Sequence, residues 1–519
     1  MAPLKQPRDL LWSAMTAASE MIITRIALSS GPDEEDHLKD LVQMNIPPPL
    51  LGDILAYAVK RLSVYHKQDT QPHTISSLLN VLLHPRLTEI KLSDLSYLGS
   101  VDMSWLDELE STLIQVLPAM KDLVHVDIST NRNHITLPSC SAAVLRCLGQ
   151  SCPKLEVLDL NNNNRINGES LYELYPTSYN IGCINLEKIY IQDCSVEPED
   201  VAMLIHSFPN LKLIGYKELG RALYLLKTRR KMFGRKKKAA PYRLMLTHVD
   251  NSLSRIERSD GEILEFISQS CPDLTNLKAR VTDEDVIHLK DLKNLQHLEL
   301  RYYTGTHHHI GHQTHKFFRS YECQKLTSLT IFCNILFSRH VEIIANNCSN
   351  LNKLFLHANN CALDSQLQNS QQRNYLEKLE VFNIRVGCDE LIMSPIACDV
   401  AVYLLKKANL IQEIYLLIRT DRINHEFIAS LIIENKFYNL RILICDAPRR
   451  TLAAPMLALT LETAYLLMDN CPSLNMLGNL IAWHITDDQL TELNHSIKEL
   501  NYDLTIISSK ANKLNSKYF

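Results

Sequence analysis

The chain has 519 residues, several times more than one hydrophobic core usually holds, so we expect several domains or an array of repeats. Apolar residues make up 46% and charged residues 22%, a balance that excludes wholesale disorder. The formal net charge of −4 gives no overall attraction to nucleic acid or membrane, and we expect neither as a partner.

Residues 1–84 are predicted to form a small helical module. Charged residues interrupt the first apolar patches, so we expect neither a signal peptide nor a membrane span, and a location in the cytoplasm, the nucleus or both. The segment NIPPPLLGDILAYAVKRL (45–62) places prolines before an apolar helix. Its candidate residues for binding a partner protein are Pro48, Leu50, Leu51, Ile54 and Leu55. The alternative is that the module only shields the first repeat, as the end of any repeat array requires.

The pattern L-x-x-L-x-L then recurs along residues 85–500. It begins at residues 87, 123, 155, 186, 211, 274, 295, 326, 351, 376, 411, 440 and 474, at intervals of 21 to 36 residues with one gap of 63. A degenerate strand at 242–249 would divide that gap. Parallel stacking of such strands merges the residues at positions 1, 4 and 6 into one core, so we expect a solenoid of about 13–14 repeats. Asparagines recur three residues after the last of these positions, where a side-chain amide can satisfy backbone groups: Asn131, Asn163, Asn334 and Asn359.

Helical segments with apolar residues at i, i+3 and i+4 separate the predicted strands. Four of them end before a proline that directs the chain into the next strand, at Cys152-Pro153, Phe208-Pro209, Cys271-Pro272 and Cys471-Pro472. The 14 cysteines occur singly, and none forms a C-x-x-C pair. We therefore expect reduced, buried cysteines and neither disulfides nor a zinc site.

The segments CPDLTNLKARVTDEDVIHL (271–289) and CPSLNMLGNLIAWHITDDQL (471–490) resemble the cysteine-containing class of leucine-rich repeats. Such repeats are typical of the F-box/leucine-rich-repeat family, the substrate receptors of cullin-type ubiquitin ligases. The resemblance implies an α/β leucine-rich-repeat horseshoe that binds a protein substrate, with no cofactor and as a monomer within a hetero-complex. Segment 45–62 is similar to the opening of an F-box, and this resemblance implies that its candidate binding residues contact a cullin adaptor. The segment LLWSAMTAASEM (10–21) instead resembles the short elongin-binding helix of other cullin receptors.

Two polar segments within the repeats are candidates for other functions. The stretch KTRRKMFGRKKK (227–238) is either a nuclear-import signal or a solvated loop, and its candidate residues are Arg229, Arg230, Lys231, Arg235, Lys236, Lys237 and Lys238. The stretch HHHIGHQTH (307–315) is either a metal-binding loop or, as we expect, a solvated one. No P-loop, G-x-S-x-G, H-E-x-x-H or zinc spacing occurs, so we predict no enzymatic activity.

Side chains at positions 3, 5 and 7 of each strand are predicted to line the concave face. These positions are mostly polar or charged up to residue 301, and aromatic or aliphatic residues follow. Exposed apolar residues in such number favour a binding surface for a partner protein or a cover formed by the C-terminal tail, residues 501–519. The alternative is that late, imperfect repeats turn these residues into the core. The candidate partner-binding residues are Phe332, Phe355, Phe382, Tyr415, Leu417, Ile442, Ile444 and Met476.

Overall fold

The computed structural model divides into two compact units, Met1–Arg255 and Ile256–Phe519, which we describe separately. The residues it describes are 7–29, 31–65, 72–93, 104–130, 140–177, 182–232, 243–251, 260–303, 310–364, 376–387, 395–406, 408–418, 420–435, 437–446, 457–500 and 502–507.

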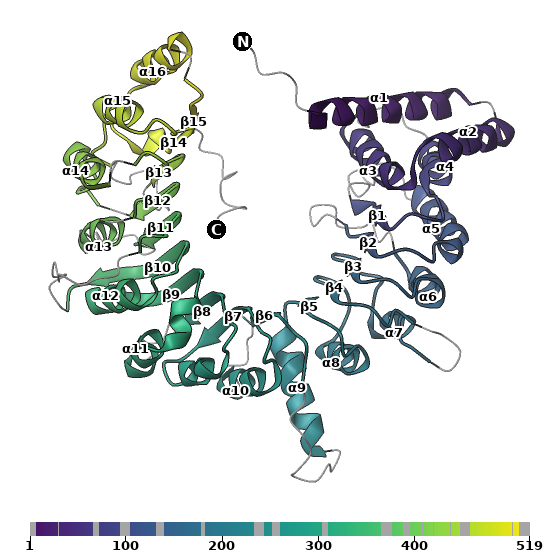
Figure 1. Ribbon diagram of the computed structural model, residues 1–519, viewed down its shortest axis with the longest axis horizontal. Coiled ribbons are helices and arrows are strands. Elements are labelled where there is room, and N and C mark those ends of the chain that lie inside the picture. Colours follow the sequence, from purple (N-terminus) through teal and green to yellow (C-terminus); the bar gives the residue numbers. More distant parts are fainter. Residues whose placement is uncertain are drawn as a thin grey trace. The chain divides into compact units, whose positions relative to one another are not determined.

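The first unit begins with four helices and continues with alternating strands and helices (Figure 1). The initial helices are α1 (Pro7–Leu28), α2 (Pro32–Asn45), α3 (Pro48–Tyr65) and α4 (Pro72–Leu82). The strands are β1 (Glu89–Lys91), β2 (His125–Asp127), β3 (Val157–Asp159), β4 (Lys188–Tyr190), β5 (Leu213–Gly215) and β6 (His248–Asn251). The intervening helices are α5 (Ser104–Val116), η2 (Leu117–Ala119), α6 (Ala142–Ser151), α7 (Gly168–Tyr172), α8 (Pro198–Ser207) and α9 (Leu219–Met232).

The second unit repeats the alternation with longer strands. They are β7 (Asn276–Val281), β8 (His297–Tyr302), β9 (Ser328–Phe337), β10 (Lys353–Ala362), β11 (Val381–Val386), β12 (Glu413–Ile418), β13 (Ile442–Asp446), β14 (Met476–Gly478) and β15 (Thr505–Ile507). The helices are α10 (Asp260–Ser270), η3 (Asp285–Asp291), α11 (His312–Phe318), η4 (Tyr321–Lys325), α12 (Ser338–Asn347), α13 (Ile396–Leu405), α14 (His425–Asn435), α15 (Leu461–Asn470), η5 (Leu480–Ala482) and α16 (Asp487–Glu499).

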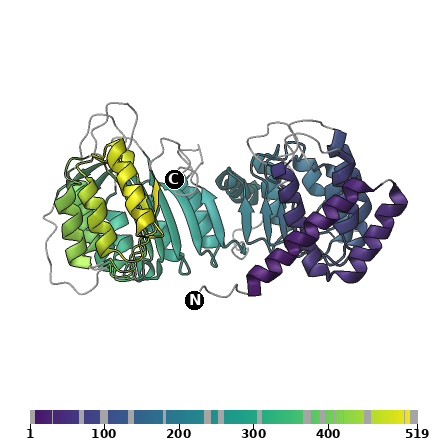
Figure 2. The same cartoon turned by 90° about the horizontal axis from the view of Figure 1, so that it is seen from above.

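In both units the strands are parallel and neighbours follow sequence order. Residues at positions 1, 4 and 6 form the core: Leu155, Leu158 and Leu160 are all fully buried. The helices pack on the side of the strands to which these residues point, and consecutive helices lie beside one another (Figures 1 and 2). The predicted α/β leucine-rich-repeat solenoid is therefore confirmed. Strand β15 pairs with β14 and lies within the segment that we expected to be a tail.

The asparagine prediction is confirmed at Asn163, where the buried side-chain amide donates to the carbonyl oxygens of Ile128 (3.0 Å) and Leu160 (2.8 Å). Asn334 and Asn359 behave differently. They lie inside the ten-residue strands β9 and β10, and Asn359 Nδ2 donates to Asn334 Oδ1 across the pair (3.0 Å). Asn131 lies outside the described residues.

The predicted helix ends are confirmed, since α6, α8, α10 and α15 all stop at the residue before the Cys or Phe that precedes proline. The cysteines at these ends are buried and unpaired. Burial raises the pKa values of Cys152, Cys271 and Cys471 to about 12, so these thiols stay protonated at neutral pH. Among the described residues, no helix is both long and apolar enough to cross a membrane.

Candidate functional site on the open face of the second unit

Side chains that alternate with the core positions project from the opposite side of the strands, which we call the open face. In the second unit the strand register arranges them in rows. One row runs Lys278, Glu299, Thr330, Phe355, Asn383, Tyr415 and Ile444, and the next runs Arg280, Arg301, Phe332, His357, Arg385, Leu417 and Asp446. Residues far apart in the sequence thus become neighbours at the strand spacing of about 4.8 Å.

The open face of β7 to β11 carries mostly positive charge. Its basic side chains are Lys278, Arg280, Arg301, Lys353 and Arg385, and Glu299 is its acidic side chain. Glu299 Oε1 accepts a hydrogen bond from Arg301 Nε (2.6 Å), and its Oε2 lies 3.8 Å from Lys278 Nζ. Because basic side chains outnumber acidic ones on these strands, this part of the face favours a negatively charged ligand.

Three side chains in this area stack on one another. The Arg301 guanidinium lies over the Phe332 ring, 4.3 Å from its centroid. Phe332 in turn stacks on His357, with ring centroids 4.4 Å apart and planes 12° apart. Burial, with Arg385 and Arg301 nearby, lowers the pKa of His357 to about 4, so this imidazole is neutral at physiological pH. The stack holds a cationic group in a fixed place on the face.

The apolar residues predicted for the later strands do lie on the open face, but their centre is not exposed. Tyr415, Leu417 and Ile444 are buried and form a cluster of their own. Val381, Ile442, Met476 and Ile507 pack around them and are partly buried. On these strands the apolar side chains therefore bury one another, and Ile507 of β15, within the segment expected to be the tail, adds to the cover.

The prediction that Phe382 lines this face is wrong. Its Cα pairs with those of Leu354 and Ile414, both core residues, and the side chain is fully buried. The repeat there begins at Leu379, three residues after the predicted start at Leu376, and this shift moves Phe382 from position 7 to position 4. Phe332 and Phe355 do lie on the open face and are half-buried.

When the repeat is counted from Leu379, Asn383 becomes the open-face residue between Phe355 and Tyr415. It is completely buried, and neither Nδ2 nor Oδ1 has a hydrogen-bond partner. This site was not predicted, because a repeat that begins at Leu376 makes Asn383 position 8, which points to the core side of the strand.

The open face of the first unit is more acidic. Glu89 forms an ion pair with Lys91 (2.8 Å), and its carboxylate lies 2.5 Å from His125 Nδ1. Asp127 and Asp159 are neighbours in the next row. Burial, reinforced by Asp127, raises the pKa of Asp159 to about 6 although Asn161 N–H donates to its carboxylate.

The N-terminal helices place the predicted adaptor-binding residues differently from expectation. Leu51, Ile54 and Leu55 of α3 are buried, because α3 packs against α1 and β1. Only Pro48 and Leu50 are partly exposed. Three of the five candidate adaptor-binding residues are therefore buried within the helical module.

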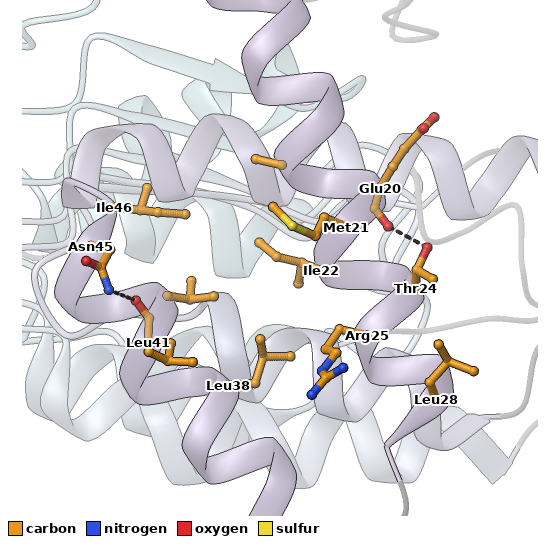
Figure 3. A pocket seen from close by; sticks show the side chains of 12 residues that line it. Glu20, Met21, Ile22, Thr24, Arg25, Leu28, Leu38, Leu41, Asn45 and Ile46 are labelled. Carbon is orange, nitrogen blue, oxygen red and sulfur yellow. Dashed lines mark hydrogen bonds between the residues drawn. The ribbon is translucent and has the colours of Figure 1, made fainter.

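Helices α1 and α2 instead expose large apolar side chains. They are Leu10, Leu11, Trp12, Met21, Leu28, Leu41 and Met44. A groove of about 850 Å³ lies between these helices, and Figure 3 shows Met21 and Ile22 on one side of it and Leu38 and Ile46 on the other. Since α1 has apolar residues on all its sides, helical periodicity alone could not indicate which of them would be exposed.

The two polar segments are only partly described. Arg229, Arg230 and Lys231 belong to α9, whereas Arg235, Lys236, Lys237 and Lys238 lie outside the described residues. In the histidine-rich segment, His312 and His315 belong to α11, and the His315 ring lies 5.0 Å from that of His340. Within the described ranges, no group of three or more His, Cys, Asp or Glu side chains is placed to hold a metal ion.

No family model matches the sequence, and no curated protein matches it. Solved structures with a similar fold include a leucine-rich-repeat protein of Leptospira interrogans, at 13% identity and a TM-score of 0.36, covering 87% of this chain and 98% of that one. Another is the yeast Rad7–Elc1 complex, at 12% identity and a TM-score of 0.45, covering 98% and 99%. A third is LegL7 of Legionella pneumophila, at 14% identity and a TM-score of 0.29, covering 57% and 81%. Similarity at this level does not indicate which proteins this chain binds.

Proposed function

We propose that this chain is a non-catalytic recognition subunit that brings a protein substrate to a cullin-RING ubiquitin ligase. In this proposal the open face of the second unit binds the substrate, and α1 and α2 bind a cullin adaptor. The ligase role comes from the resemblance of the repeats to those of ligase receptors. The proposed place of action is the cytoplasm or the nucleus, and segment 227–238 is a candidate import signal.

The observation that carries the proposal is the apolar surface of α1 and α2. A helix pair that only capped the first repeat would turn its apolar side chains inward and present a polar outer face. Here Met21 of α1 is 68% exposed and Leu41 of α2 is 47% exposed, and both line the groove. Exposed apolar side chains gathered on one surface mark sites of protein association. An apolar helix of an adaptor would fill such a groove.

The competing function is a leucine-rich-repeat scaffold with no link to ubiquitin. A scaffold would use the same open face and would need no cullin adaptor. Both functions predict partners of the second unit, so only the partner of α1 and α2 separates them.

The test is affinity purification of the full chain from cells, with bound proteins identified by mass spectrometry. The double variant Met21→Glu/Leu41→Glu places two charges at the groove, while Ile433→Glu, at a 78% exposed residue of α14, is the matched control. We expect cullin, RING and adaptor subunits with the wild type and the control, and their loss from the double variant. If the wild type captures none of these subunits, the ubiquitin role is wrong and the scaffold remains.

A further inference from the structure

The strongest unexplained feature of the open face is the Asn383 side chain. A buried amide normally finds partners for its two donors and its acceptor, and leaving such groups unpaired costs stability. In β11 the neighbouring core residues Phe382 and Ile384 point away from it, and Phe355 and Tyr415 flank it in its own row. Apolar rings can satisfy neither Nδ2 nor Oδ1. The amide therefore has an unpaired donor and an unpaired acceptor, and a ligand that offers both an acceptor and a donor would pair with them.

A peptide backbone offers this combination, since each residue carries one N–H and one C=O. An asparagine side chain can donate to the C=O and accept from the N–H of the same extended segment. Because Asn383 is completely buried, access requires a flanking ring to change rotamer. Phe355 is half-buried whereas Tyr415 is buried and donates a hydrogen bond to Glu413 (2.9 Å), so Phe355 is the less constrained of the two rings.

The charges beside Asn383 determine which segment fits. Arg385 lies two residues further along the same strand, and Arg301 lies three strands away in the row of Arg385. Three strand spacings separate these two arginines by about 14 Å. In an extended segment, residues four apart are about 13 Å apart. Two acidic side chains at that separation would each meet an arginine.

We propose that the open face of β8 to β12 binds an extended acidic segment of a partner protein. The backbone of the segment pairs with the Asn383 amide, and its acidic residues at i and i+4 pair with Arg301 and Arg385. This inference rests on the proposed role of the open face in partner binding and adds the chemical class of the partner. The chain's own last residues, SSKANKLNSKYF (508–519), contain three lysines and are therefore not complementary in charge to the basic open face of these strands.

The test uses the full-length chain on an array of nine-residue peptides in a Gly/Ser background. Each peptide carries two glutamates, and their separation varies from one to seven positions. A second set replaces both glutamates by lysines. We expect the strongest binding when the glutamates are four positions apart, and none from the lysine set. The best peptide is then labelled with fluorescein and its affinity is measured by fluorescence anisotropy.

Two variants examine the proposed contacts. We expect Arg385→Gln and Asn383→Leu each to weaken peptide binding at least tenfold. The control Lys188→Ala removes an open-face cation of the first unit and should change the affinity less than twofold. Leucine has nearly the shape of asparagine and needs no hydrogen bonds, so Asn383→Leu should unfold at an unchanged or higher temperature. Lost binding together with unfolding at a lower temperature would assign Asn383 a structural role and overturn its place in the site.

The acidic-segment proposal is wrong if the lysine or uncharged peptides bind as well as the glutamate peptides, or if both variants bind like the wild type. It is also wrong if a single-stranded RNA oligonucleotide binds more tightly than the best peptide and Arg385→Gln abolishes that binding. Capture of cullin subunits depends on Met21 and Leu41 and should not change in Arg385→Gln. The two proposals can therefore fail independently.

Discussion

The stability of the second unit should depend on the protonation of His340. This residue of α12 is 2% exposed, and its Nδ1 accepts a hydrogen bond from Phe337 N–H (3.2 Å). Burial, with His315 and Arg339 nearby, lowers its pKa from 6.5 to about 3, although Asp364 and the Ile310 backbone act in the opposite direction. Protonation of Nδ1 would also remove the acceptor for Phe337. The folded chain therefore holds this imidazole neutral.

The sign of the effect follows from proton binding. Between pH 3 and 6.5 the unfolded chain carries the extra proton, so stability rises with pH in that window. The contribution of His340 is complete above pH 6.5 and is lost as the pH falls towards 3. At pH 5 the loss amounts to about 2 kcal/mol, since each pH unit below 6.5 costs about 1.4 kcal/mol.

The assay is urea unfolding followed by the fluorescence of Trp483, which is buried in the second unit and donates to the Cys445 carbonyl oxygen (3.2 Å). Trp12→Phe and Trp105→Phe remove the other two tryptophans, so the signal reports this unit alone. His340→Gln cannot be protonated and should reduce the loss of unfolding free energy between pH 7.5 and 5.0 by about 2 kcal/mol. His357 and His315 remain in both proteins and cancel in the comparison. An identical pH dependence with and without His340 would refute the reasoning.

Other predictions concern stability and thiol reactivity. The carboxylate of Asp283 caps α11 by accepting from the N–H groups of Gly311 (2.8 Å), Gln313 (3.0 Å) and Thr314 (2.9 Å), so Asp283→Ala should cost about 1–2 kcal/mol in urea unfolding. Asn163→Ala should cost about 2 kcal/mol, because two buried carbonyl oxygens lose their donor, and an unchanged midpoint would contradict this. Tyr415→Ala should lower stability by about 3–4 kcal/mol whereas half-buried Phe355→Ala costs less than half as much; equal losses would contradict this. Cys152 should react with iodoacetamide at pH 8 only after unfolding, as peptide mass spectrometry can verify.

The repeat architecture was predictable because its signal is redundant. Each strand contributes the same three core positions, and more than a dozen copies at a regular interval leave little freedom for another fold. The cysteines before proline were equally informative, since they mark both a helix end and a buried site. Strand β15 was missed because YDLTII (502–507) lacks the leucine pattern, although it pairs with β14.

The residues of the open face were harder to predict, because their assignment depends on which residue is taken as position 1 of each repeat. Strand side chains alternate between two faces, so a frame error of an odd number of residues exchanges them. At β11 both Leu376 and Leu379 are buried and both fit the first position of the pattern. Only the pairing of Leu354 with Phe382 decides between them, and that pairing is a property of the folded chain. The error placed a core phenylalanine on the open face and concealed Asn383.

The separation of the two faces also explains how one scaffold can carry a specific binding site. On β7 to β10 the core residues and the open-face residues belong to different sides of the strand, so charges such as Lys278 and Arg301 can change without disturbing the core. On β12 and β13 this independence ends, because Tyr415, Leu417 and Ile444 form a second buried cluster. Asn383 lies on β11, at the border between the mostly positive open face of β7 to β11 and that buried cluster. A polar group there gains both the low dielectric that strengthens a hydrogen bond and the neighbouring arginines that select an acidic ligand.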